Sequence, residues 1–273
     1  MENARGGAID FRFAQSGRRT IGCRPGKDDV SLFEELDFRP TPIGALILRR
    51  RRNLKLDVDV FEILLGDDHL MSSLFTASEI ALAELGLAAV PGGRLDVVVG
   101  GLGLGYTAQA VLEYESVASL IVVEMLEPVI DWHRQGLLPL GTTVTENPRC
   151  RIVHDDFFAL AASGTGFDPE TPARRFDAIL VDIDHTPVAL LDERSAAFYT
   201  PEGLRIFARH LKPGGIFGLW SDDDRDPAFV DRLDNVFASA WSESVTFQNP
   251  LQDRSFTQTV YLARIGTDAE ETR

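Results

Sequence analysis

The segment 95–107 joins an apolar strand to a glycine-rich turn. Its sequence, Leu-Asp-Val-Val-Val-Gly-Gly-Leu-Gly-Leu-Gly-Tyr-Thr, runs from the strand into Gly101, Gly103 and Gly105. Glycines at this spacing let the backbone turn tightly and let a ligand approach without a Cβ in the way. Glu124 follows 19 residues after Gly105, at the end of the next apolar strand, where a carboxylate can accept hydrogen bonds from both hydroxyls of a ribose. The pattern therefore predicts a site for an adenosine-containing ligand.

A second acidic pair follows the third apolar strand of this region. Asp155 and Asp156 come directly before Phe157. A carboxylate at such a strand tip can accept a hydrogen bond from the adenine amino group while apolar side chains enclose the ring. The same glycine loop would serve a dinucleotide, so a nicotinamide-dependent oxidoreductase is the last alternative. It is disfavoured because no hydride-handling group of residues follows the fourth strand.

Titratable side chains also follow the fourth and fifth strands. Asp182, Asp184 and His185 come after an apolar strand, and the run 222–224, which is three aspartates, comes after the next one. Ligands of open α/β sheets bind beyond the carboxyl ends of the strands. Carboxylates that converge there suit a cationic amine, and one of them can accept the proton that the amine loses on attacking a sulfonium carbon. His185, beside two carboxylates, is a second candidate for the base or a substrate contact. Two alternatives stay open: a solvated loop that caps a helix for residues 222–224, and an exposed loop histidine with no catalytic role for His185.

The elements that must position these residues alternate between strand and helix. Short, continuous apolar strands that alternate with helices indicate a parallel sheet covered on both faces. The sequence therefore predicts an α/β, Rossmann-like class I methyltransferase fold, mostly parallel, with an antiparallel closing β-pair. The expected strands are 95–99, 120–123, 151–153, 178–181 and 216–220, the helices are 106–113, 128–135 and 201–211, and the closing pair is 245–248 with 259–263.

The region before the glycine loop has a different pattern. Residues 31–70 alternate between apolar and polar with a period of two, which predicts a small antiparallel β-domain. A helical period over 73–87 opens the nucleotide-binding domain, expected over 71–265, and loose tails are expected at 1–30 and 266–273. The basic run 49–52 is interpreted as a solvated strand end or a salt-bridged interface rather than a nucleic-acid site.

Composition excludes several classes of protein. The chain has 273 residues, 44% of them hydrophobic, and a formal net charge of −15, which argues against nucleic acid as a partner. The two cysteines, Cys23 and Cys150, are too few for a disulfide framework, so a cytoplasmic protein is expected. No apolar stretch is long enough to span a membrane, and the five histidines show no spacing that indicates a metal.

From about Leu46 to Ala263 the chain resembles the spermidine synthase-like branch of class I S-adenosylmethionine-dependent transferases. The resemblance implies a homodimer, an amine substrate, and either S-adenosylmethionine or its decarboxylated form as the co-substrate. In that family a G-G-G-D-G-G loop, a ribose-binding acid, a G-D-G-x-x-F segment and a D-S-S-D-P segment carry the site. They match residues 100–105, Glu124, 154–157 and the stretch from Asp182, so that Asp155 would contact adenine and Asp182 would accept the proton, while Asp222 would hold the far end of a polyamine and Phe198–Tyr199 would supply aromatic contacts.

The departures from the family pattern concern the donor. The family's aspartate in the glycine loop, which holds the aminopropyl amine, falls at Gly103, and the D-E-F-x-Y-x-E motif appears at 72–79 without its Asp and Tyr. The resemblance with these departures implies methylation of a small cationic or amine substrate from S-adenosylmethionine, with Asp182 as proton acceptor and Asp184, Asp222 and Tyr199 as substrate contacts. Aminopropyl transfer is the alternative. A non-catalytic nucleotide-binding or scaffold protein is the alternative of another class.

Overall fold

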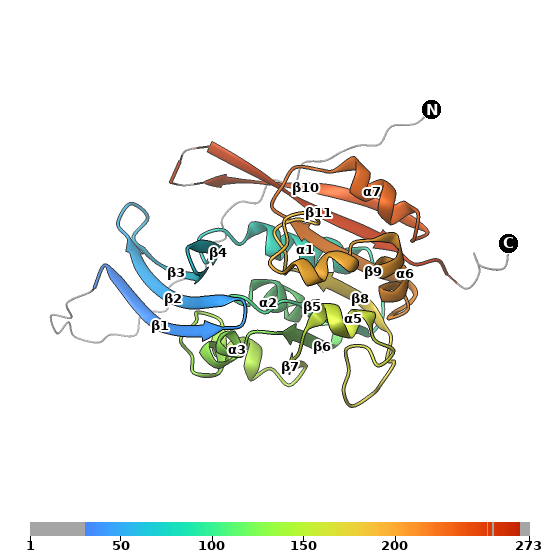
Figure 1. The fold of residues 1–273 in the computed structure, drawn as a ribbon, viewed down its shortest axis with the longest axis horizontal. Coiled ribbons are helices and arrows are strands. Elements are labelled where there is room, and N and C mark those ends of the chain that lie inside the picture. The colour runs from blue at the N-terminus through green and yellow to red at the C-terminus, as the bar shows by residue number, and fades with distance from the viewer. Residues whose placement is uncertain (1–30, 250, 253, 268–273) are drawn as a thin grey trace.

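A sheet of seven strands forms the centre of the protein. The computed structural model describes residues 31–249, 251–252 and 254–267, so the predicted tail 1–30 and most of the second predicted tail lie outside the described residues. The strand order is β10-β11-β9-β8-β5-β6-β7, with β5 to β9 parallel and β10 and β11 antiparallel at one edge (Figure 1). The predicted parallel sheet with its closing β-pair is confirmed. Its strands are β5 (Leu95–Gly100), β6 (Val117–Glu124), β7 (Cys150–His154), β8 (Phe176–Val181), β9 (Leu211–Ser221), β10 (Ser239–Asn249) and β11 (Arg254–Arg264).

Helices cover both faces of this sheet because its strands are apolar on both sides. In β5, Val97 and Val99 belong to one buried cluster and Val98 to the other. The first cluster includes residues of α1 (Ala77–Ala88), α2 (Tyr106–Leu112), α3 (Glu127–Arg134) and α4 (Gly141–Thr145). The second includes residues of α5 (Phe157–Ala162), α6 (Pro201–Ala208) and α7 (Pro227–Asp234), with the short helix η1 (Glu193–Ala197) before α6. In the described part of the chain no helix has both the length and the apolar character needed to cross a membrane.

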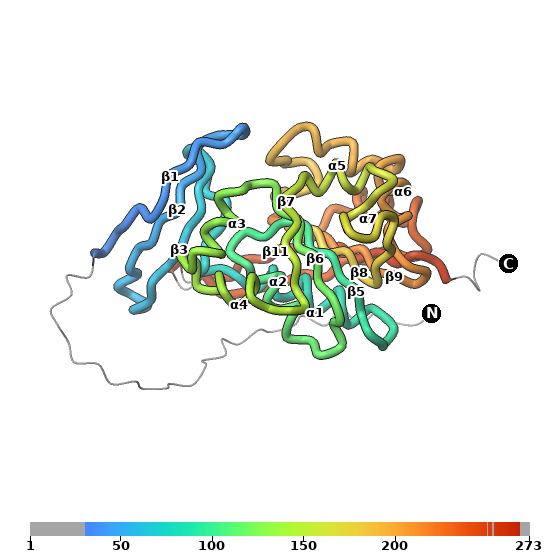
Figure 2. The backbone as a smooth tube through the Cα atoms, turned by 90° about the horizontal axis from the view of Figure 1, so that it is seen from below, coloured from blue at the N-terminus to red at the C-terminus, as the bar shows by residue number. Residues whose placement is uncertain are grey.

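A separate antiparallel sheet precedes the large one. Its strands are β1 (Phe33–Thr41), β2 (Gly44–Asn53), β3 (Val58–Leu65) and β4 (Asp68–Ser72), paired in that order. The sheet stands beside α3 (Figure 2), where the Trp132 indole N–H donates to Asp37 Oδ2 at 2.7 Å. The predicted small β unit is therefore present. Its last strand, β4, extends to Ser72, two residues beyond the predicted boundary at residue 70.

Ion pairs occupy the basic run of β2. Arg49 Nε and Arg51 Nε lie 2.7 Å and 2.9 Å from the carboxylate of Glu62 on β3, and that side chain is buried. Burial by itself would raise the pKa of Glu62, but hydrogen bonds from His69 and the two arginines lower it to about 2. Arg50 pairs with Glu34 on the other neighbouring strand. The salt-bridged interpretation of this run is confirmed.

The order of the strands brings two tips together. From β5 the chain continues to β6 and β7 on one side, and it then returns to β8 on the other side of β5. The carboxyl ends of β5 and β8 thus meet at the point where the strand order reverses, which is where open α/β sheets bind their ligands.

Candidate functional site

The turn after β5 is shaped by three glycines. Gly101, Gly103 and Gly105 have φ angles of 92°, 48° and 93°, in a region that other residues rarely adopt. A Cβ on Gly101 would lie 2.1 Å from the backbone oxygen of Asp182. The predicted glycine loop is therefore in close contact with the tip of β8, and it leaves bare backbone facing the space above.

Glu124 holds this loop from the end of β6. Its carboxylate accepts hydrogen bonds from the backbone N–H groups of Leu102, at 3.0 Å, and Leu126, at 2.8 Å. The side chain is only 8% exposed. Burial raises the pKa of Glu124, although the backbone donors oppose that change. Glu124, which is predicted to bind a ribose, thus lies against the glycine loop.

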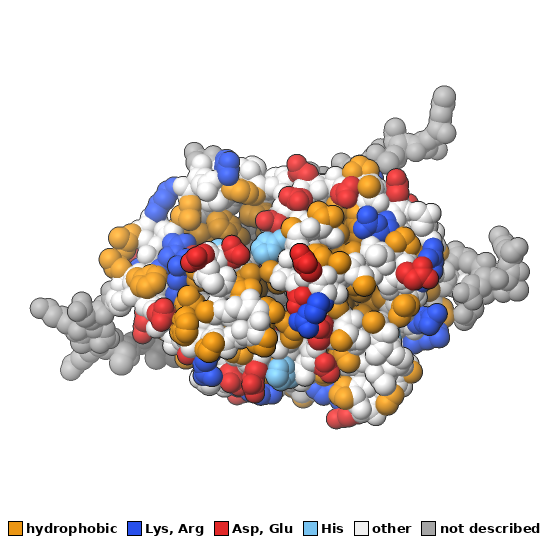
Figure 3. Space-filling view, viewed as in Figure 1, with side chains coloured by type: hydrophobic (Ala, Val, Ile, Leu, Met, Phe, Trp, Pro, Cys, Tyr) orange, Lys and Arg blue, Asp and Glu red, His pale blue; other side chains and the backbone are white. Residues whose placement is uncertain are grey.

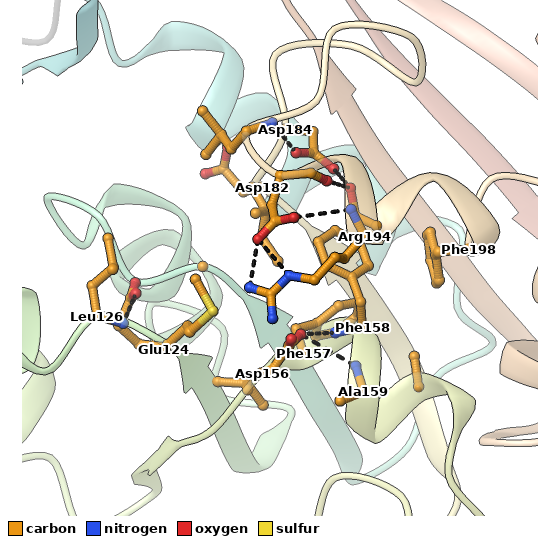
Figure 4. A pocket seen from close by; sticks show the side chains of 18 of the residues that line it. Glu124, Leu126, Asp156, Phe157, Phe158, Ala159, Asp182, Asp184, Arg194 and Phe198 are labelled. Carbon is orange, nitrogen blue, oxygen red and sulfur yellow. Dashed lines mark hydrogen bonds and ion pairs between the residues drawn. The ribbon is translucent and has the colours of Figure 1, made fainter. Parts of the chain in front are cut away.

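A cavity of about 550 Å³ lies above the loop. Glu124 stands on one side of it, and Phe157, Phe158 and Phe198 stand on the other (Figure 4). Rings and apolar side chains around a space of this size can enclose a nucleoside. Arg194, which pairs with Asp192, also reaches this cavity from the loop after β8.

Of the two acids after β7 that were predicted to bind the cofactor, the structure places one at the large cavity. Asp156 lines the large cavity, and its Oδ1 caps α5 by accepting hydrogen bonds from the backbone of Phe158 at 2.9 Å and Ala159 at 3.2 Å. Asp155 is exposed, accepts a hydrogen bond from the backbone of Asp156, and is not among the described residues that line the cavity. Asp156 therefore lies at the large cavity and Asp155 does not, and an adenine contact by either residue stays a prediction.

A second cavity, of about 290 Å³, adjoins the first. Three acidic residues line it: Glu79, Asp182 and Asp222. The face seen in Figure 3 carries acidic side chains around a hollowed, largely hydrophobic surface. Both cavities share lining residues from the glycine loop, from the loop after β8 and from β4, which are Leu70, Met71, Gly103, Asp182, Ile183 and Leu191.

Asp182 lies where the two cavities meet. Its backbone N–H donates to the Gly100 carbonyl at 2.9 Å, and its Oδ2 accepts a hydrogen bond from the Thr107 hydroxyl at 2.6 Å. Burial raises the pKa of Asp182, and the bond from Thr107 opposes that change. Burial and the charge of Asp182 likewise raise the pKa of Glu79. In the free site, the negative charge on Asp182 therefore disfavours ionisation of Glu79.

Two predicted substrate contacts, Asp184 and Tyr199, are hydrogen-bonded to each other, and of the two only Asp184 lines the large cavity. Asp184 is 1% exposed, and its carboxylate accepts hydrogen bonds from the Tyr199 hydroxyl at 2.8 Å and the Leu191 backbone at 2.7 Å. Tyr199 is 2% exposed and is not among the described residues that line either cavity. The prediction of Tyr199 as a substrate contact is therefore wrong, because its hydroxyl is used to hold the loop after β8 in place.

His185 and Asp222 are brought together at the second cavity. The backbone N–H of Asp222 donates to the His185 carbonyl at 2.7 Å, and both residues line the cavity. The Asp222 carboxylate accepts a hydrogen bond from Gln258 on β11. The residue that caps α7 is Asp226, which accepts from the backbone of Ala228 at 2.9 Å. Residues 222–224 therefore do not cap α7, but all three are exposed, as the solvated-loop alternative expects.

Sequence reasoning missed three residues at this site. Glu79 lies in the first turn of α1 and interacts electrostatically with Asp182, Thr107 donates a hydrogen bond to Asp182, and Met71 lines both cavities. The available signal for Glu79 was its position as the last residue of the motif at 72–79. Among the described residues, no group of three or more His, Cys, Asp or Glu side chains could hold a metal ion.

Comparison with known proteins identifies the family. Residues 76–224 match the spermine/spermidine synthase domain. The chain belongs to this family. Solved spermidine synthases have the same fold: the enzyme from Thermotoga maritima gives a TM-score of 0.65 with 19% identity, over 87% of this chain and 75% of that one. A spermidine synthase in complex with the transition state analogue AdoDATO gives 0.66, with the same identity and coverage.

Curated relatives of this spermine/spermidine synthase family member have two kinds of name. Polyamine aminopropyltransferase 2 of Pseudomonas aeruginosa is 26% identical over 168 residues, which are 59% of this chain and 45% of the relative. Putrescine N-methyltransferase 2 of Nicotiana attenuata is 27% identical over 135 residues, which are 50% and 33%. The chain thus spans less than half the length of these relatives. The predicted family is confirmed, whereas the homodimer, the cytoplasmic location and the domain boundaries stay predictions.

In this family member, Glu124→Ala is expected to weaken binding of methylthioadenosine by about 1–3 kcal/mol. The mutation removes the carboxylate that would accept the ribose hydroxyls and that also holds the glycine loop. Isothermal titration calorimetry measures the change, and the exposed Glu146→Ala is the control. Equal affinities of wild type and Glu124→Ala would show that Glu124 does not bind the ribose.

Proposed function

We propose that this protein transfers an alkyl group from an S-adenosylmethionine-type donor to the nitrogen of a small amine. The observation that carries the proposal is the position of Asp182, which lines both the large cavity and the acidic one. A group at this junction can contact the acceptor while the donor occupies the neighbouring space. Membership of the spermine/spermidine synthase family supports the same reaction class.

The large cavity suits the donor. The glycine loop offers bare backbone, Glu124 offers a carboxylate for the ribose, and the phenylalanines beside α5 offer an apolar enclosure for adenine. The donor supplies a carbon bonded to a positively charged sulfur, and the bond between them breaks with its electron pair going to sulfur.

The second cavity suits a cationic amine. Glu79, Asp182 and Asp222 supply negative charge, and Tyr106 and Trp220 supply ring surfaces that attract cations. An ammonium group must lose a proton before its nitrogen can attack the carbon. Asp182 is placed to accept that proton, and burial brings its pKa closer to that of a useful base.

Aminopropyl transfer from decarboxylated S-adenosylmethionine is the first candidate for the alkyl group. It replaces methylation as the preferred interpretation because aminopropyltransferases and spermidine synthases lead the comparisons. Methyl transfer is the second candidate. It is favoured by Gly103, where the family has an aspartate, and by the similarity to putrescine N-methyltransferases.

The products distinguish the two candidates. Incubation with putrescine and each donor, followed by mass spectrometry, should give methylthioadenosine from the decarboxylated donor if the aminopropyl group moves. S-adenosylhomocysteine from the intact donor would instead establish methyl transfer. If neither nucleoside product forms with putrescine or with a panel of other amines, the proposed transferase activity is wrong.

The double mutant Gly103→Asp/Met71→Ala is expected to bind decarboxylated S-adenosylmethionine about ten- to a hundredfold more tightly than wild type. The new carboxylate can hold the terminal ammonium of that donor. The second mutation is needed because a Cβ at Gly103 would lie 2.7 Å from the sulfur of Met71. Calorimetry with both donors tests this, with Met71→Ala alone as the control. An unchanged ratio of the two affinities would mean that position 103 does not select the donor.

A further inference from the structure

Thr107 is a polar residue on an apolar helix, and it touches the proposed base. We propose that Thr107 is a positioning residue that fixes the Asp182 carboxylate and keeps it ionised for attack by the amine. This inference rests on the proposed function, since it assigns Thr107 a part in the same proton transfer. The contact, the surroundings and the charge balance support it in turn.

The contact joins two distant parts of the chain. Thr107 lies in the first turn of α2, two residues after Gly105, and is 3% exposed. A threonine in a helix commonly donates back to a carbonyl of the preceding turn. Here the hydroxyl donates instead to Asp182 Oδ2, at 2.6 Å. Thr107 therefore joins α2 to the tip of β8.

The rest of Asp182 is fixed through its backbone. Its N–H donates to the Gly100 carbonyl at 2.9 Å, and its carbonyl oxygen packs against the bare backbone of Gly101. These contacts fix the backbone of Asp182 and leave its side chain free to rotate. Because Thr107 occupies Oδ2, it sets that rotation and directs Oδ1 to receive the proton of the amine.

The burial of Asp182 among titratable side chains gives this donor its role. Glu79 faces it from α1, Asp222 follows β9, His185 follows in the loop after β8, and Tyr106 precedes Thr107 on α2. Burial of the site favours the protonated form of Asp182, which cannot act as a base. A hydroxyl that donates to the carboxylate favours the ionised form, and Thr107 is the side chain that does so.

Thr107→Val tests the proposal because valine keeps the shape and removes the hydroxyl. The acidic limb of the pH profile of kcat is expected to move up by about 1 to 2 pH units, as for loss of a hydrogen bond to a charged group. At high pH kcat should recover, and the KM for the donor should stay near the wild-type value. Thr107→Ser should restore the wild-type limb, and Thr107→Ala, which suits a helix, is a second variant without the hydroxyl.

Thr259→Val is the matched control. Thr259 is also buried, but its hydroxyl donates to the backbone carbonyl of Asp223 at 2.8 Å. Its removal should leave the acidic limb in place. A limb that stays unchanged in Thr107→Val and Thr107→Ala, or that moves equally in Thr259→Val, would overturn the proposal.

A second readout needs no turnover. Carbon-detected NMR follows the Asp182 carboxyl through a pH titration, with Asp182→Asn assigning the resonance, and its midpoint should rise in Thr107→Val. An unmoved midpoint overturns the role of Thr107 even if the protein is an active transferase. A raised midpoint in a protein that alkylates no amine would instead overturn the proposed function and support the coupling of Thr107 to Asp182.

Discussion

Asp182→Asn is expected to lower kcat by about 10²–10⁴-fold while leaving the affinity for the adenosine donor nearly unchanged. Asparagine keeps the shape of the side chain but cannot accept a proton from an ammonium group. The donor is expected to rely on Glu124 and the glycine loop instead, which lie on the other side of the junction. Steady-state kinetics and calorimetry on the same preparations measure the two quantities.

The wild-type pH profile provides a second check on Asp182. A carboxylate base is active above its pKa, and burial raises the pKa of Asp182, so the acidic limb should lie above the usual range of an aspartate. That limb should be absent from Asp182→Asn. The exposed Asp223→Asn is the control and should keep both the rate and the limb. Retention of more than about a tenth of wild-type kcat by Asp182→Asn would exclude it as the base, and His185, which lines the same cavity, would be examined next.

Gly101→Ala is expected to lower the free energy of unfolding by about 2–5 kcal/mol, from backbone strain together with overpacking. Gly101 has a φ of 92°, and the new Cβ would lie 2.1 Å from the Asp182 carbonyl oxygen. The tips of β5 and β8 would have to separate, so donor binding should also be lost. Denaturant unfolding and calorimetry measure the two effects.

Gly92→Ala is the control for Gly101→Ala. Gly92 precedes β5, has no left-handed φ, and has open space where a Cβ would be placed. Its replacement should leave both stability and donor binding close to wild type. If Gly101→Ala were as stable as Gly92→Ala, the close contact between the glycine loop and the tip of β8 would not exist in solution.

The large sheet could be predicted because its strands are long enough to show a pattern. The run 95–99 is apolar at every position but one and the run 178–181 at every position, as expected for strands buried on both faces. Several other elements were not predicted because they are too short to show such a pattern. β4 and α4 have five residues each and α5 has six, which is too short for a period to be recognised.

The sequence predicted which residues of the site follow the ends of strands, but not how their side chains are oriented. Parallel strands place their following residues at one edge, and this rule located the glycine loop, Glu124 and Asp182. It does not say which way a side chain points, so it did not show that Asp156, and not Asp155, lines the large cavity. Nor does spacing show contacts between distant elements. The bond from Thr107 to Asp182 spans 75 residues, and Glu79 approaches from still earlier in the chain.

The small sheet forms one wall of both cavities. Met71, on β4, touches the space for the donor and the space for the acceptor, and a side chain at Gly103 would collide with it. The seven-stranded core takes no part in that contact except through the glycine loop. Substrate choice can therefore diverge through changes in a peripheral hairpin, without any alteration of the nucleotide-binding scaffold. The small sheet and the glycine loop are therefore separate parts of the chain that meet at Met71, and a change on β4 alters both cavities at once.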